Sequence, residues 1–289
     1  MPKLRNRVCV LLQLNVQTEL LCNEMPSQSA PLNPAKLEQI ATLRSHGFVV
    51  IRALIEAAHC AEIKRAVRAQ FLAKSAPVEY EADVRYPGAP ASRYAAGGDT
   101  VRRLLNAYDR DTVFRHWAAW PGIVDWMQTY FDEPVVLSRA HHNCIMTKHP
   151  AYGSLTGWHQ DARYWSFKRN DLISVWLALG PERVHNGALR FVPGSHRITL
   201  PSNCFDKAQF FCAHPERHPD MAALTQTALS PELNAGDAVF FHCNTLHAAG
   251  ANSSSAIKFS LVFTYHGVSN PPLPGSRSAS LPEAALTLP

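Results

Sequence analysis

The sequence predicts a mainly β domain with flanking helices, and a barrel or two-sheet roll as its core. Short β-rich runs follow one another from residue 134 onward, whereas the runs before them have helical spacing. With 289 residues, of which 46% are hydrophobic, the chain can bury a large core within one domain. Turn-forming pairs separate the β-rich runs, namely Asn186-Gly187, Pro193-Gly194 and Gly236-Asp237.

The helices and the first strand are expected in the N-terminal part. Asn33 suits a helix N-cap, Pro34 the first helical position, and Gly47 the end of that helix. The run FVVIR (48–52) then predicts a buried strand, and residues 56–71 a second helix. Residues 75–100 have no clear period, which fits either a loop over a site or a solvated connection. Residues 103–130 are expected to be helical, with a break at 120–122.

Six runs predict the strands of the core. They are VVLSRAHHNCIM, GWHQDARYW, LISVWLAL, ALRFVPG, DAVFFH and KFSLVFTY. Residues 25–270 are therefore expected to form the domain. Residues 1–24 are expected to be a disordered extension, and residues 271–289, rich in Pro, Ser and Ala, a disordered tail.

Composition bounds the location and the partners. No apolar run approaches the roughly 18–20 residues that a membrane span needs. The apolar run VCVLLQL after Lys3, Arg5 and Arg7 is short and lacks a small-residue cleavage site, which argues against export. Seven cysteines without a CxxC pair favour a reducing, cytoplasmic setting. The net charge of +5 is scattered, so no nucleic-acid partner is expected.

A histidine and an aspartate stand one residue apart in GWHQDARYW. On a strand, His159 and Asp161 would share one face, with Gln160 on the other, so both could reach one ion. Such pairs also occur as plain surface residues. Two histidines and one carboxylate form the facial triad of non-heme Fe(II) oxygenases. His247 is the best third ligand, and His242 is the rival for that position.

The ordered runs TKHPAYGSLTGWHQD, ISVWLAL, NGALRFVPGSH, GDAVFFHCNTLHAAGANSS and KFSLVFTY resemble the phytanoyl-CoA dioxygenase family. The resemblance extends from about Gly47 to Tyr265. It implies a double-stranded β-helix core of the jelly-roll, cupin-like type. It also implies an oxygenase that uses Fe(II), 2-oxoglutarate and O2, with a metal triad of His159, Asp161 and His247.

Other family roles transfer less directly. The family holds the distal carboxylate of 2-oxoglutarate with an arginine, and Lys258 stands at that position here, while an assisting serine is replaced by Ala249. Lys258 and Ser260 share a strand face, which suits an anion inside a barrel, although Lys258 could also lie on an outer face. The resemblance adds three residues to the cosubstrate pocket, which are Arg103, Cys144 and Trp176. Trp176 could equally be core packing.

Arg163 and Trp165, which follow the proposed metal ligands in the chain, indicate the chemical class of the substrate. Arg163 and Trp165 continue the alternation of His159 and Asp161, so a cation and an indole are expected beside the metal. They suit a small anionic substrate with an apolar part, whereas packing at the barrel rim is the plain alternative. Asp161 fills the position that related halogenases leave open for chloride, so hydroxylation is expected. The competing hypothesis is a cupin-like binding protein or a non-oxidative metalloenzyme.

Overall fold

A computed structural model describes residues 33–286 except 85, 87, 215 and 217. The extension predicted for residues 1–24 lies outside these residues, as do residues 25–32. None of the described helices combines the length and the apolar character that a bilayer crossing would require.

Antiparallel pairing joins the strands into two sheets. The larger sheet has the order β1-β9-β7-β11-β5-β3-β2, and β4 pairs with both β11 and β12. Its strands are β1 (Phe48–Ile51), β2 (Val78–Tyr80), β3 (Val101–Leu105), β4 (Val135–Ser138), β5 (Cys144–Lys148), β7 (Ile173–Ala178), β9 (Ala238–His242), β11 (Lys258–Gly267) and β12 (Ala284–Leu286). The smaller sheet has the order β6-β10-β8, formed by β6 (Thr156–His159), β10 (His247–Ala249) and β8 (Leu189–Phe191).

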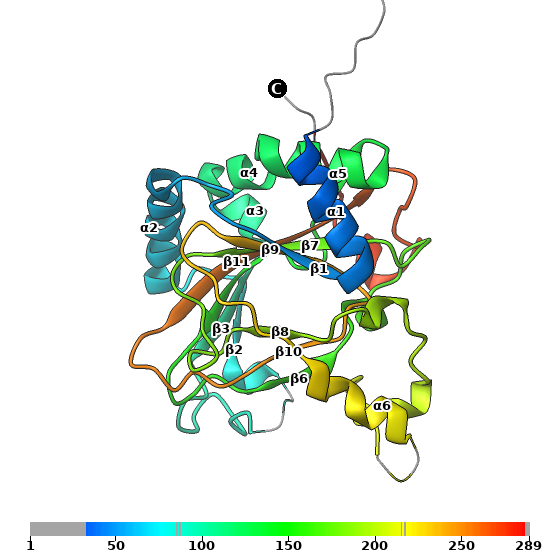
Figure 1. The fold of residues 1–289 in the computed structure, drawn as a ribbon. Coiled ribbons are helices and arrows are strands. Elements are labelled where there is room, and N and C mark those ends of the chain that lie inside the picture. The colour runs from blue at the N-terminus through cyan, green and yellow to red at the C-terminus, as the bar shows by residue number, and fades with distance from the viewer. Residues whose placement is uncertain (1–32, 85, 87, 215, 217, 287–289) are drawn as a thin grey trace, which may run out of the picture. The chain divides into compact units, whose positions relative to one another are not determined.

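Five helices cover the outer face of the larger sheet, and the smaller sheet lies on its other side (Figure 1). They are α1 (Pro34–His46), α2 (Ala57–Ala73), α3 (Ala107–Arg110), α4 (Thr112–Ala118) and α5 (Pro121–Phe131). The short helix α6 (Pro219–Ala223) lies on the side of the smaller sheet instead (Figure 1). The mainly β jelly-roll architecture confirms the predicted fold class.

The long strand β11 shows how the two faces are divided. Leu261, Phe263 and Tyr265 are fully buried in the core that the helices complete. Val262 instead belongs to a second apolar cluster with Trp176. Because side chains alternate along a strand, Lys258 and Ser260 share the face of Val262, inside the roll. Both are buried, which rules out the outer-face alternative for Lys258.

The first helix follows its sequence signals closely. The Asn33 side chain accepts a hydrogen bond from Ala35 N at 3.0 Å, and Pro34 is the first helical residue. Gly47 ends the helix with φ of 84° and donates to the Leu43 carbonyl. This left-handed position favours glycine, as the sequence predicts.

Arg103 departs from the expected helix. It lies on strand β3, and α3, α4 and α5 follow as three separate helices. Pairing of β3 with β5, in which Arg103 faces Met146, holds this segment extended. Tertiary pairing thus overrides the local helical pattern.

Residues 271–286 depart from the disorder predicted for residues 271–289. The last of these residues form β12, which pairs with β4 and buries Leu286 in the main core. Ser278 is buried and shares a hydrogen bond of 2.7 Å with His141. The sequence of this segment has no regular hydrophobic period, but these contacts hold the segment on the larger sheet.

Candidate metal centre

His159, Asp161 and His247 come together at the end of the smaller sheet. His159 is the last residue of β6, and His247, the first of β10, faces it directly in the register. Asp161 begins a turn of 3₁₀ helix, which bends its carboxylate back toward both imidazoles. The three ligand atoms lie within 4.8 Å of one another, and Asp161 is 3.6 Å from His159 and 3.9 Å from His247.

Hydrogen bonds fix the orientation of both imidazoles. Nδ1 of His159 is 2.9 Å from the Gly157 carbonyl, and Nδ1 of His247 is 2.9 Å from the Thr245 carbonyl. A carbonyl can only accept, so each Nδ1 carries the proton and each Nε2 keeps a free lone pair. Both Nε2 atoms face Asp161. This tautomer is the one that binds a metal through Nε2.

Electrostatics favour a cation at this point. Burial lowers the pKa of His159 to about 4 and the pKa of His247 well below its usual value, so both rings are neutral. Burial also raises the pKa of Asp161 well above its usual value, although the charge of Arg103 works against this. Oδ2 of Asp161 is buried without a hydrogen-bond partner. A divalent cation would satisfy this orphaned oxygen, so the donor set fits a metal ion.

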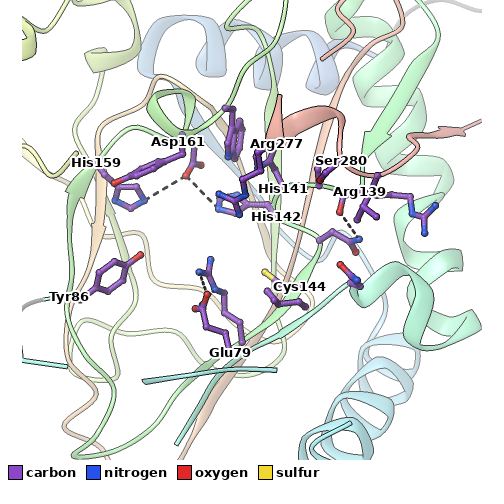
Figure 2. Close-up of a pocket in the computed structure, with 18 residues that line it drawn as sticks. Glu79, Tyr86, Arg139, His141, His142, Cys144, His159, Asp161, Arg277 and Ser280 are labelled. Atoms are coloured by element: carbon purple, nitrogen blue, oxygen red, sulfur yellow. Dashed lines mark hydrogen bonds and ion pairs between the residues drawn. The ribbon is translucent and has the colours of Figure 1, made fainter. Parts of the chain in front are cut away.

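The sequence patterns missed a third histidine beside the aspartate. Figure 2 shows His142 on the side of Asp161 opposite His159, with Nε2 3.5 Å from Oδ1. Nδ1 of His142 shares a 3.1 Å hydrogen bond with Ser174. The adjacent histidines in RAHHNC were its one signal, but nothing in that run shows which ring turns inward.

A cavity of about 330 Å³ opens onto the triad. It is lined by His159 and Asp161, and by Arg103, Cys144 and Trp165 among the residues predicted for cosubstrate or substrate. Three further lining residues came from segments without a clear pattern, which are Glu79, Tyr86 and Arg277. The segment 75–100 therefore reaches the wall of the site through Glu79 and Tyr86, as the expectation of a segment over a site has it, although Glu79 lies on strand β2 rather than in a loop.

The predicted cation Arg103 already has a partner. Its guanidinium makes two hydrogen bonds of 2.7 Å to the carboxylate of Glu79. This two-pronged pair lies in the cavity wall.

Lys258, Ser260 and Trp176 do not line this cavity. They surround another glutamate, Glu182, which the sequence patterns also missed. Trp176 is both packed in the second apolar cluster and hydrogen-bonded, so the core-packing alternative describes part of its role.

Of the two predicted substrate residues, the structure brings one to the cavity. Trp165 lines it and stacks on His141, with ring centroids 5.1 Å apart. Arg163 lies elsewhere, 3.6 Å over the Phe205 ring, and donates to Gln209. The alternation from His159 stops at Asp161, because the chain turns into a 3₁₀ helix there. The prediction of Arg163 beside the metal is therefore wrong.

His242, the rival ligand, also lies away from the triad. Its Nδ1 accepts a hydrogen bond from Asn244 N at 3.1 Å, and its Nε2 is 3.7 Å from Asp171. It is the last residue of β9 and belongs to the turn that leads to β10.

Comparisons with known proteins agree with this geometry. The family model described as phytanoyl-CoA dioxygenase (PhyH) matches residues 43–260. A probable phytanoyl-CoA dioxygenase of Caenorhabditis elegans is 27% identical over 171 residues, which is 58% of this chain and 54% of that protein. The peroxisomal phytanoyl-CoA dioxygenase of Rattus norvegicus is 24% identical over 82% of this chain and 70% of its own length.

A solved structure shares the fold. The crystal structure of EctD from S. alaskensis with 2-oxoglutarate and 5-hydroxyectoine has a TM-score of 0.68 and 19% identity, over 86% of this chain and 80% of that one. The chain thus aligns with about half the length of the nematode relative and with most of EctD.

Proposed function

This chain belongs to the phytanoyl-CoA dioxygenase family, and we propose that it is an Fe(II)- and 2-oxoglutarate-dependent dioxygenase that hydroxylates a small anionic molecule. We assign His159, Asp161 and His247 as the Fe(II) ligands. The observation that carries this assignment is the orphaned Oδ2 of Asp161, which lies 3.9 Å from the free Nε2 of His247, while the free Nε2 of His159 lies 3.6 Å from Oδ1 of the same carboxylate.

These three side chains would hold an Fe(II) ion, and they are fewer than the ligands that such an ion accepts. When bound there, Fe(II) supplies the oxidising chemistry, in which 2-oxoglutarate is converted to succinate and CO2. The two backbone carbonyls that hold Nδ1 protons keep both imidazoles in the ligating tautomer. His142 approaches the other oxygen of Asp161 and orients that carboxylate.

The cavity sets the size of the substrate. Its volume of about 330 Å³ is at the small end of typical ligand pockets, roughly 300–1,000 Å³. Trp165 and Tyr86 provide aromatic surface for an apolar part of the molecule. The solved EctD structure contains 5-hydroxyectoine, a small molecule, and a substrate of comparable size fits this space.

Positive charge at the edge of the cavity supports an anionic substrate. Arg277 lines the cavity and is exposed, and no ion pair to its guanidinium occurs among the described residues. Arg139 also lines the cavity, but it pairs with Asp109 at 2.6 Å. Arg277 is therefore the side chain best placed to contact a carboxylate or phosphate of the substrate.

Two measurements test the proposal. Purified protein should bind one Fe(II) per chain and form succinate from 2-oxoglutarate in the presence of O2. If the chain binds iron but forms no succinate from 2-oxoglutarate, whichever member of a small-acid library is added as substrate, it is a metal-binding protein without oxygenase activity.

The substrate-binding role is tested by matched arginine variants. Arg277→Ala should raise KM for the substrate about fivefold, since an exposed charge contact contributes up to about 1 kcal/mol. Arg163→Ala is the control, because it lies outside the cavity wall. Equal KM values in both variants and the parent would remove Arg277 from substrate binding.

A further inference from the structure

Inside the roll, three buried donors converge on one carboxylate, that of Glu182. Lys258 Nζ is 3.0 Å from Oε2, Trp176 Nε1 donates to Oε1 at 2.8 Å, and Ser260 Oγ donates to Oε1 at 2.5 Å. Glu182 is completely buried, and the three donors are each at most 8% exposed. Together the donors form a site for one carboxylate, called here the carboxylate subsite.

The backbone fixes Glu182 in this subsite. Its N–H donates to the Leu233 carbonyl at 2.9 Å, and Leu233 N–H donates back to the Glu182 carbonyl at 3.1 Å. Arg183 reinforces the same point, because its Nη1 donates to the carbonyl of Glu182 at 3.0 Å. These backbone hydrogen bonds hold the main chain of Glu182 in place, and so they fix the position from which its carboxylate enters the subsite.

The subsite is connected to the metal centre through packed side chains. Trp176 belongs to the apolar cluster that contains Phe191 and Phe241. Both of these rings contact His247, with centroid distances of 6.0 Å and 5.1 Å. The donors therefore face the same interior as the metal centre. They are also the residues expected to hold the distal carboxylate of 2-oxoglutarate.

We propose that Glu182 is an internal occupant of the carboxylate subsite, and that it removes the preference of this enzyme for a 2-oxo acid with a distal carboxylate. This inference rests on the proposed function. The end of a glutamate side chain and the distal end of 2-oxoglutarate are the same group, a carboxylate on a methylene. Glu182 neutralises Lys258 and satisfies the other donors, and a second carboxylate at the same ammonium would be repelled.

The proposal predicts an unusual cosubstrate profile. In 2-oxopentanoate a methyl group replaces the distal carboxylate of 2-oxoglutarate, and the two acids have the same number of carbon atoms. A charge-assisted contact to a distal carboxylate normally contributes about 10- to 150-fold in affinity. In this chain the dissociation constants of the two acids should agree within about threefold.

The first test needs neither metal nor turnover. Glu182→Ala leaves the three donors around a space of carboxylate size, so propionate should raise the thermal midpoint of the metal-free variant. It should leave the parent unchanged. The control is Glu232→Ala, an exposed glutamate whose partner is Arg183 rather than Lys258. If propionate stabilises the parent and both variants equally, Glu182 is not the occupant.

The second test measures cosubstrate preference in the anaerobic Fe(II) protein by its metal-to-ligand absorption. Glu182→Ala should bind 2-oxoglutarate about 10-fold more tightly than 2-oxopentanoate, or better. If Glu182→Ala does not fold, Glu182→Gln keeps the shape without the charge, and the preference should shift in the same direction. A parent protein that prefers 2-oxoglutarate by 10-fold, with the preference lost in Lys258→Ala, overturns the proposal. Failure of both acids to bind contradicts the proposed function, while the propionate test still decides the role of Glu182.

Discussion

Replacing Asp161 by asparagine should stabilise the metal-free protein and abolish iron binding. Oδ2 of this carboxylate is buried without a hydrogen-bond partner, and burial raises its pKa well above the usual value. Its charge therefore opposes folding until a cation binds. An asparagine keeps the shape, removes the charge, and can donate its amide N–H to a free Nε2 of His159 or His247.

The two effects have opposite signs and measurable sizes. An unsatisfied buried polar group costs about 1–3 kcal/mol. For a chain of this size, each kcal/mol shifts the thermal midpoint by about 2–4 °C, so metal-free Asp161→Asn should melt about 2–12 °C higher. Iron at 100 times its dissociation constant stabilises the native protein by about 2.7 kcal/mol. Adding iron should not raise the thermal midpoint of Asp161→Asn.

Thermal melts with chelator and with anaerobic Fe(II) separate the two effects. Asp220→Asn, an exposed aspartate on α6, is the matched control and should behave as the parent in both conditions. A lower midpoint for metal-free Asp161→Asn would show that the carboxylate is already compensated. Stoichiometric iron in the variant would refute the ligand assignment.

Further predictions concern other parts of the chain. His159→Ala and His247→Ala should each lose bound iron, whereas His242→Ala should retain it, as metal analysis of the purified proteins would show. A chain ending at residue 270 should lose at least about 3 kcal/mol in urea unfolding, since it lacks β12 and its buried leucine. Burial lowers the pKa of Lys148 to about 7. The unfolded chain holds that proton up to about pH 10.4, so stability rises with pH above 7. Lys148→Met should remove about 1.4 kcal/mol of the gain in unfolding free energy between pH 6 and 8.

The sequence was most informative where periodicity and spacing agree with the fold. The alternation along β11 correctly places Lys258 and Ser260 inside the roll, because both residues pair in regular register with β5 and a paired strand keeps its two-residue period. The capping signals around α1 are local, so they hold without knowledge of the remaining structure.

Prediction failed where the period breaks or where the contact is distant. The prediction for Arg163 assumes that the strand continues beyond His159. The strand ends there, and the 3₁₀ helix that begins at Asp161 turns the Arg163 side chain away from the metal centre. Glu79 and Glu182 lie 24 and 76 residues from the cations that they neutralise. No local pattern reports such pairs, because the partners meet through sheet pairing and a loop connection.

These distant pairs change how charge is distributed in the site. Arg103 and Lys258, the two cations expected to attract the cosubstrate, are matched by Glu79 and Glu182 at 2.7 Å and 3.0 Å. A paired charge in a buried site contributes little net attraction for a further anion. We therefore expect chelation at the metal to be the main source of cosubstrate affinity, and Arg277 at the cavity wall to remain available for the substrate. With the interior cations neutralised and Arg277 unpaired among the described residues, charge would attract a small anionic substrate to Arg277, and the Glu182 carboxylate inside the roll would not compete for it.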